Sequence, residues 1–126
     1  MHLPENLYYT ESHEWISVQG DIATIGITDF AQSELGEIVF VELPEVGTKV
    51  SADEPCGSIE AVKAAEDLIA PLSGIVEEKN SDVEERSALI NESAFEEGWL
   101  FKIRMSAPEE VENLMSALDY RRMVEG

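Results

Sequence analysis

Lys63 lies in the run SIEAVKAAED (58–67), where its immediate neighbours Val62 and Ala64 offer no counter-charge. The chain holds 27 acidic and only 8 basic side chains, so a lysine without an adjacent carboxylate is unusual. Two chemistries use such an amine. A Schiff-base nucleophile needs a desolvated pocket that lowers the pKa of the lysine, whereas an amine that an enzyme acylates needs exposure, a rigid turn and uncrowded neighbours.

Strand-like segments on both sides must position this lysine. Residues 57–60 and 67–70 are nearly symmetric about Lys63 and predict two arms of a hairpin with the lysine at its tip. A hairpin tip is a poor place for a desolvated pocket, so the pattern favours acylation. Most exposed lysines only add solubility, and the residues alone leave that interpretation open.

Turn chemistry predicts the elements before the lysine. Apolar and polar residues alternate over 15–27 on both sides of Gly20-Asp21, which indicates a hairpin that turns there. A short helix near 29–35 is expected, capped by Thr28-Asp29 and stopped by Gly36. Residues 37–43 carry apolar side chains on both faces, which favours a central strand that ends at Pro44.

The second half adds further short strands and a C-terminal helical segment. Turn residues recur regularly between Gly47 and Asn80, and residues 99–105 alternate as a final strand. Ser106 and Glu109 match a capping box, and one amphipathic stripe is expected at Val111, Leu114, Met115 and Leu118. We predict a mainly β fold, a flattened barrel or sandwich, in a single domain over 1–126.

Composition excludes several function classes. A net charge of −19 repels phosphate backbones and anionic lipid, so neither nucleic acid nor membrane is expected as a partner. The charge has two interpretations, steering toward basic protein surfaces or simple solubility, and composition favours solubility. No apolar run approaches the roughly 20 residues that span a bilayer. No basic leader is visible, which predicts a prokaryotic cytoplasm or a mature mitochondrial form.

Metal and hydrolytic sites are also disfavoured. Two histidines and the single Cys56 cannot supply a metal cluster, and Cys56 is expected to be a partly buried hydrophobe. His13 follows Ser12, but neighbours in an extended segment point to opposite faces, so proton transfer between them is not expected. We interpret His13 as a strand-edge packing residue. No glycine-rich phosphate loop is present.

Six blocks along the chain carry a family resemblance. They are YTESHEW (9–15), ATIGITDFAQ (23–32), LGEIVFVELPEV (35–46), SIEAVKAA (58–65), APLSG (70–74) and GWLFKI (98–103). In this order and spacing they resemble the H protein of the glycine cleavage system over nearly the whole chain. The resemblance implies that the expected flattened barrel or sandwich is of the biotinyl/lipoyl-carrier type. Methionines usually flank the lysine of biotin carriers and are absent beside Lys63, so the resemblance favours lipoate over biotin.

The resemblance implies a shuttle rather than an enzyme. Lys63 matches the lysine that bears lipoate in amide linkage, attached by a lipoate-attaching enzyme. The arm is expected to serve glycine decarboxylase, aminomethyltransferase and dihydrolipoyl dehydrogenase, with the chain acting as a monomer. Two further sets of residues match the family. Ser12, Glu14 and Asp67 match a cleft that shelters the loaded arm, and Glu60 and Glu66 are expected to be recognised by the attaching enzyme.

This sequence departs from the family at Phe30, where a histidine is common, and the helix there is expected to serve packing. Ala61 replaces a frequent serine, and residues 83–87 lack a frequent proline, which predicts a looser loop. Three alternatives stay open: a lipoate relay or donor, a lipoyl or biotinyl carrier of another multienzyme system, and an unmodified binding module. The N-terminal block 12–15 and the C-terminal helix favour the H protein, because minimal carriers lack both.

Overall fold

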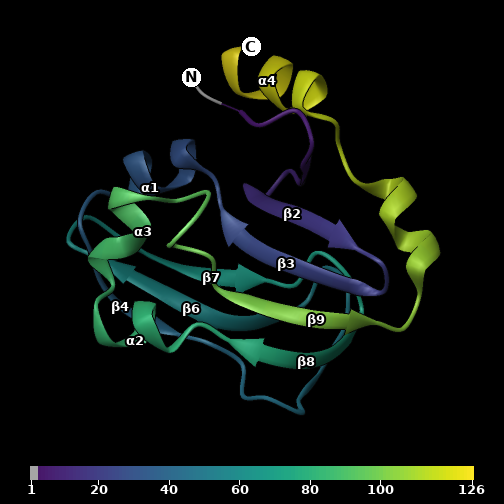
Figure 1. The fold of residues 1–126 in the computed structure, drawn as a ribbon. Helices are drawn as coiled ribbons and strands as arrows, with labels where there is room; N and C mark the ends of the chain where they lie inside the picture. Colours follow the sequence, from purple (N-terminus) through teal and green to yellow (C-terminus); the bar gives the residue numbers. More distant parts are fainter. Residues whose placement is uncertain (1–2) are drawn as a thin grey trace.

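A computed structural model describes residues 3–126, and strands dominate it (Figure 1). The first antiparallel sheet contains, in spatial order, β1 (Tyr8–Tyr9), β2 (Glu14–Gln19), β3 (Ile22–Ile27), β9 (Phe101–Met105), β8 (Gly74–Lys79) and β5 (Lys49–Val50). The second contains β4 (Ile38–Glu42), β6 (Pro55–Ala61) and β7 (Ala65–Ile69). The predicted mainly β sandwich is confirmed.

One hydrophobic core joins the two sheets. Ile25 and Ile103 of the first sheet are fully buried in the same cluster as Ile59 and Leu68 of the second. This cluster explains the alternating pattern of the strands, because each sheet turns one face toward the other. The predicted last strand, β9, lies at the centre of the first sheet, between β3 and β8.

The predicted elements near the N-terminus are confirmed. β2 and β3 form a hairpin that turns at Gly20, whose φ of +64° suits glycine. Helix α1 (Asp29–Leu35) begins at Thr28, whose hydroxyl accepts a hydrogen bond of 3.2 Å from the backbone N of Ala31. It ends at Gly36, with φ +81°.

The prediction of a central strand at 37–43 was wrong, because β4 lies at the edge of the three-stranded sheet. The register of β4 on β6 shifts between Ile38 and Phe40, which marks a bulge. The bulge turns Val39 and Phe40 outward, with 52% and 50% of their surface exposed. Apolar residues at successive positions therefore reflect a bulged edge rather than a strand covered on both faces.

The prediction of one amphipathic helix after Ser106 was also wrong. The segment forms a 3₁₀ helix, η1 (Pro108–Asn113), and a separate helix α4 (Ala117–Glu125). Between them, Met115 and Tyr9 exchange backbone hydrogen bonds of 2.9 and 2.8 Å. This pairing requires extended backbone and breaks the predicted stripe, so Leu118 is 56% exposed.

Two short helices were not predicted. They are α2 (Ser81–Glu85) and α3 (Ala88–Glu92), and α2 occupies the region where a looser loop was expected. Asn80 caps α2, since its side-chain oxygen accepts a hydrogen bond of 3.1 Å from the backbone N of Asp82. Val83 and Ile90 anchor the two helices in the core. An Asn cap and two buried aliphatic residues thus replace the missing proline.

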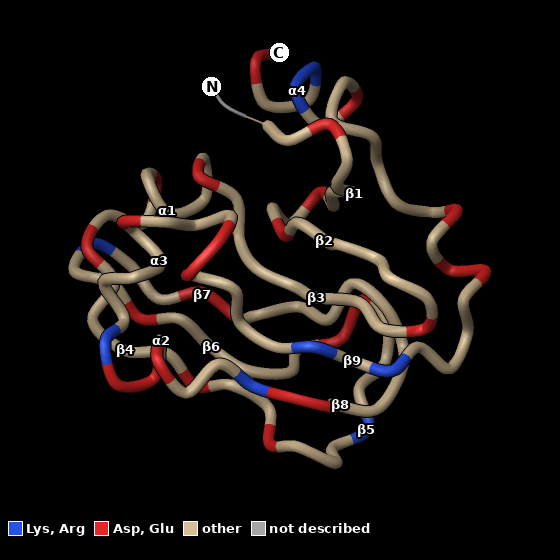
Figure 2. The backbone as a smooth tube through the Cα atoms, in the orientation of Figure 1, with Lys and Arg blue, Asp and Glu red and all other residues tan. Residues whose placement is uncertain are grey.

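Carboxylates are distributed over the whole fold (Figure 2). Most basic side chains form ion pairs with them. Arg104 on β9 contacts both Asp21 and Glu77, and Lys79 contacts Glu45 and Glu84. In residues 3–126 no helix is long and apolar enough to cross a membrane.

The corrected C-terminus predicts which serine stabilises it. Ser116 accepts a hydrogen bond of 3.1 Å from the backbone N of Asp119 at the start of α4. We expect Ser116→Ala to lower the stability of α4 by about 1 kcal/mol, measured by amide hydrogen exchange. Ser106→Ala is the matched control, because Ala107, not Ser106, precedes η1 and no side chain caps it. An equal effect of both substitutions would contradict the two-helix description.

Candidate functional site: a cleft beside Lys63

Lys63 lies in the turn between β6 and β7, as predicted, and its side chain is exposed. Two backbone hydrogen bonds fix this turn. The N–H of Ala61 donates to the carbonyl of Ala64 at 2.8 Å, and the N–H of Val62 donates to the carbonyl of Glu37 at 2.9 Å. Within the described part of the chain, no carboxylate pairs with the Lys63 amine.

The aliphatic stem of Lys63 runs over Gly36. A Cβ atom on Gly36 would lie 3.3 Å from Cε and 3.4 Å from Cδ of the lysine. Asn91 holds this glycine, because its side-chain amide donates to the Gly36 carbonyl at 2.9 Å. The Asn91 oxygen also accepts from the backbone N of Ile38 at 3.0 Å. These hydrogen bonds fix the backbone at the end of α1, against which the lysine stem lies.

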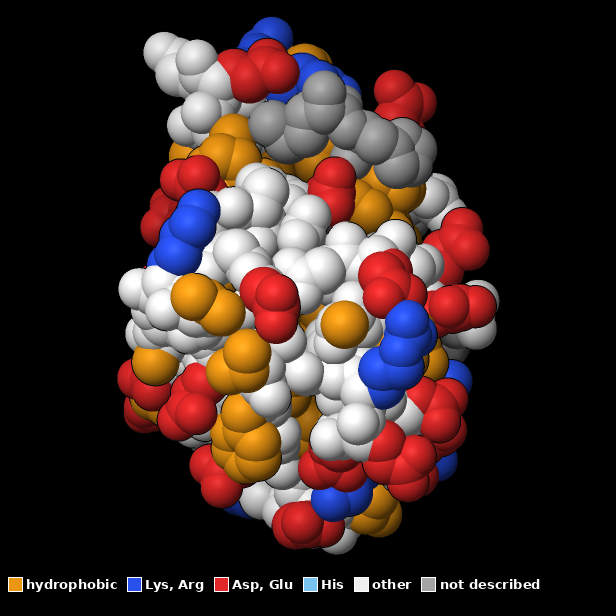
Figure 3. All heavy atoms as spheres, turned by 90° about the vertical axis from the view of Figure 1, so that its left-hand side faces the viewer, with side chains coloured by type: hydrophobic (Ala, Val, Ile, Leu, Met, Phe, Trp, Pro, Cys, Tyr) orange, Lys and Arg blue, Asp and Glu red, His pale blue; other side chains and the backbone are white. Residues whose placement is uncertain are grey.

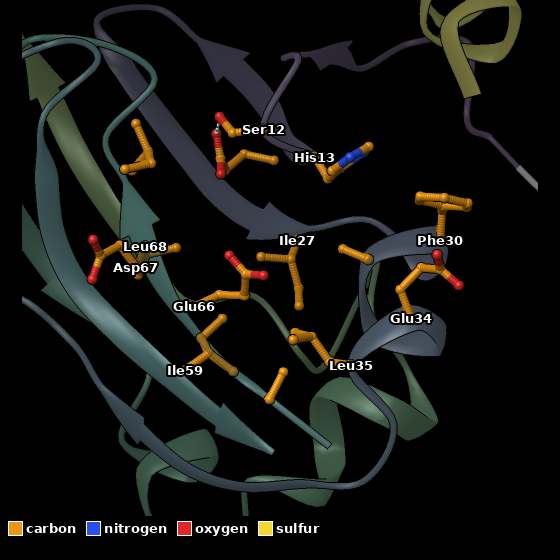
Figure 4. A pocket seen from close by; sticks show the side chains of 14 residues that line it. Ser12, His13, Ile27, Phe30, Glu34, Leu35, Ile59, Glu66, Asp67 and Leu68 are labelled. Carbon is orange, nitrogen blue, oxygen red and sulfur yellow. Dashed lines mark hydrogen bonds between the residues drawn. The ribbon is translucent and has the colours of Figure 1, made fainter. Parts of the chain in front are cut away.

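A cleft of about 520 Å³ opens beside the end of α1 (Figure 4). Its floor is apolar, formed by Ile27, Leu35, Ile59 and Leu68, all buried in the core. Polar groups gather on its walls: Ser12, His13, Glu14, Glu34, Glu66 and Asp67. An apolar cavity with a few polar groups is the usual form of a small-molecule site. Ala64 lines the cleft too, so the lysine turn adjoins its margin.

Glu14 is a buried carboxylate in this cleft, with 2% of its surface exposed. The hydroxyls of Thr10 and Ser12 donate to its Oε1 at 2.7 and 2.8 Å. Burial raises the pKa of Glu14 above its ordinary value, while the two hydroxyl hydrogen bonds oppose that rise. A carboxylate held in this way can accept a hydrogen bond from a protonated nitrogen in a site that contains little water.

His13 forms one wall, but not as a residue of an extended segment. Its φ of +71° places it in a turn before β2, so the expected geometry of residues 12 and 13 was wrong. Ser12 donates to Glu14, while His13 Nδ1 lies 2.8 Å from the Tyr120 hydroxyl. The His13 ring also packs against Phe30, with ring centroids 5.1 Å apart.

The predicted carboxylates beyond Lys63 lie on both faces of β7. Glu66 pairs in register with Ile59 of the floor, and its side chain points into the cleft (Figure 4). Asp67 pairs with Ser58 and points away, although it borders the cleft. Glu60 is exposed on β6, opposite Ala65. The structure thus brings Ser12, Glu14 and Glu66 to the cleft, with Asp67 at its rim.

The face beside the lysine turn mixes acidic and apolar side chains (Figure 3). Val62 is 71% exposed in the turn, and Val39 and Phe40 are exposed on the neighbouring strand β4. Phe40 pairs in register with Glu60. The surface around the lysine turn therefore combines exposed hydrophobic residues with carboxylates.

Several residues of the site were missed from the sequence. Sequence patterns predict Gly36 only as a helix stop and Phe30 only as a packing residue, and they give no role to Asn91 or Tyr120. The SHEW block (12–15) and the LGE sequence (35–37) were the available signals, because both lie in the blocks that carry the resemblance. Nothing in the local pattern links His13 to Tyr120, which lie 107 residues apart.

The fold and the site define a carrier domain: a β sandwich that presents one lysine on a hairpin tip beside a cleft. A family model described as glycine cleavage H-protein matches residues 7–126. The chain belongs to this family, whose members are lipoyl carriers of the glycine cleavage system.

Named relatives and a solved structure agree with this assignment. The chain is 53% identical over 122 residues to the glycine cleavage system H protein of Halalkalibacterium halodurans, covering 97% of this chain and 95% of the relative. It is 49% identical over 125 residues to that of Bacillus subtilis, covering 99% and 98%. The crystal structure of a glycine cleavage system H protein from Mycobacterium marinum matches with a TM-score of 0.91 and 38% identity, covering 98% and 100%.

Burial of Glu14 predicts a pH-dependent cost to stability. The pKa of Glu14 is higher in the folded state than in the unfolded state, where it is about 4.3. The free energy of unfolding is therefore highest below the unfolded-state pKa and falls as the pH rises through the folded-state pKa. We expect Glu14→Gln to gain in free energy of unfolding relative to the unsubstituted protein between pH 4 and 8, measured by urea denaturation. Glu11 lies on the same turn and is exposed, so Glu11→Gln is the control and should not reproduce this gain.

Proposed function

We propose that Lys63 carries lipoate in amide linkage and that residues 1–126, as a single domain, shuttle an aminomethyl group on that arm. The observation that carries the proposal is an exposed lysine, without an ion pair among residues 3–126, whose stem crosses Gly36 beside a cleft with a buried carboxylate. Family membership supports the same role. When bound, lipoate supplies the disulfide and dithiol chemistry, so this chain positions and shelters the reacting group instead of catalysing.

The cleft fits such an arm on physical grounds. Ile27, Leu35 and Ile59 offer an apolar floor for hydrocarbon and sulfur. Glu14 accepts a charge-assisted hydrogen bond from a protonated nitrogen, and its burial strengthens that bond. Ser12 and Thr10 hold the carboxylate in place. The cleft therefore keeps water away from a labile cationic cargo.

Three enzymes use the arm in this proposal. They would be glycine decarboxylase, aminomethyltransferase and dihydrolipoyl dehydrogenase, and the bound lipoate would supply the sulfur chemistry for all three. The lipoate-attaching enzyme recognises the turn through Glu60, which is exposed beside it. Glu66 faces the cleft, so we assign it to the arm as well as to this recognition. The bacterial relatives support the cytoplasm as the place of action.

Intact mass tests the attachment. We expect protein from its native cell to carry one lipoyl increment and Lys63→Arg to carry none, because arginine keeps the charge but offers no acylable amine. Lys49→Arg, a second exposed lysine, is the control and should keep the increment. A biotinyl increment would indicate a carboxylation carrier, and a bare Lys63 an unmodified binding module. Onward transfer of the lipoyl group to other proteins would favour a relay.

The lifetime of the loaded arm tests Glu14. We expect Glu14→Gln to release the aminomethyl group in water about 10- to 100-fold faster, since a hydrogen bond to a charged group contributes about 1.5–3 kcal/mol. Lipoylation itself should be unchanged, because Glu14 lies in the cleft and not in the lysine turn. Release is measured by mass spectrometry over time, with Glu11→Gln as control. Equal lifetimes would show that Glu14 does not hold the cargo.

A further inference from the structure

A chain of hydrogen bonds joins the C-terminal helix to the cleft. Tyr120 of α4 is fully buried, and its hydroxyl lies 2.7 Å from Thr28 Oγ1 and 2.8 Å from His13 Nδ1. The ring of Tyr120 stacks on Tyr9 with centroids 5.0 Å apart. The Tyr120 hydroxyl therefore has one defined position between the cap of α1 and a wall of the cleft.

The direction of each hydrogen bond follows from the number of protons. Thr28 is fully buried, and its oxygen already accepts from the backbone N of Ala31. Among residues 3–126 the Tyr120 oxygen is the only acceptor within reach of the Thr28 hydroxyl proton. The reverse direction would leave that proton buried without an acceptor, which costs free energy. Thr28 therefore donates to Tyr120, and Tyr120 must donate to His13 Nδ1.

We infer that Tyr120 is a positioning residue that, with Thr28, holds His13 as a neutral imidazole protonated at Nε2 on the cleft wall. A proton on Nδ1 would leave either the Tyr120 or the Thr28 hydroxyl proton buried without an acceptor. Burial acts in the same sense and lowers the pKa of His13, against the opposing charges of Glu34 and Glu66. Burial also raises the pKa of Tyr120, which keeps its hydroxyl a donor.

A neutral His13 matters for the charge of the cleft. Glu14, Glu34 and Glu66 line the same cavity, and an imidazolium among them would compete with a cationic cargo for these carboxylates. The C-terminal helix, which lies next to β1 and away from the lysine turn (Figure 1), thereby determines the charge of a wall that it does not line. This consequence for the loaded arm rests on the proposed function, whereas the protonation of His13 does not.

The tautomer of His13 in the unmodified, ¹⁵N-histidine-labelled protein is the first test. We expect the ¹⁵N shifts at neutral pH to report an unprotonated Nδ1 and a protonated Nε2, with His2 assigned separately by His2→Gln. Tyr120→Phe keeps the stacked ring but removes the donor, so the Nδ1 shift should move and the tautomers should mix. Tyr8→Phe, a tyrosine of the same strand as Tyr9 with no hydroxyl hydrogen bond among the described residues, should change nothing.

The loaded, lipoylated protein provides the second test. Tyr120→Phe should release the aminomethyl group roughly 2- to 10-fold faster, the factor that corresponds to one hydrogen bond, and Tyr8→Phe should not. In a His13→Gln background, Tyr120→Phe should add little, since the two residues act in one chain.

Different outcomes overturn different claims. A proton on Nδ1 of His13 in the unsubstituted protein would overturn the inference whether or not any variant folds. An unchanged release rate in a folded Tyr120→Phe variant would overturn its consequence for the arm. A bare Lys63 by intact mass would overturn the proposed function instead, which the tautomer does not depend on.

Discussion

The site depends on where the β6–β7 hairpin holds the Lys63 backbone. Pairing of these strands and the two backbone hydrogen bonds at the turn leave the lysine little freedom at its root. The stem then crosses Gly36, where a side chain would press against it. The contact between the Lys63 stem and Gly36 therefore limits the directions that a group attached to the lysine amine could take over the surface.

Electrostatics in the cleft differ from those of the surface around it. Outside, carboxylates are solvated and screened by salt, so each contributes little to any single contact. Inside, Glu14 has lost its water, and both its hydroxyl partners come from the turn that precedes β2. The net charge of −19 therefore says little about the site. The chemistry of the cleft depends instead on one buried carboxylate, Glu14, next to His13, which we infer to be neutral.

Local chemistry explains what could be predicted from the sequence. Gly20, Thr28 and Gly36 have strong conformational preferences, so the first hairpin and α1 followed from single residues. The strand at 37–43 was placed at the centre of a sheet because its pattern cannot distinguish a bulged edge from a doubly covered strand. The prediction of one helix that begins after Ser106 was wrong because the backbone pairing of Met115 with Tyr9 overrides local helix preference. The Tyr120–His13 contact depends on how distant segments meet, which periodicity does not record.

A carrier protein must also release its arm to the enzymes that it serves, which limits how tightly the cleft can bind that arm. In the proposed function the arm is tethered to Lys63, so its docking would be intramolecular and even weak contacts would suffice to hold it. A charge-assisted hydrogen bond of about 1.5–3 kcal/mol keeps a tethered group docked most of the time while leaving the open state populated. Several such bonds would trap the arm away from its enzymes. In the proposed function, one carboxylate beside a neutral histidine would meet both demands, because it would hold a cationic cargo and release the arm once that cargo is transferred.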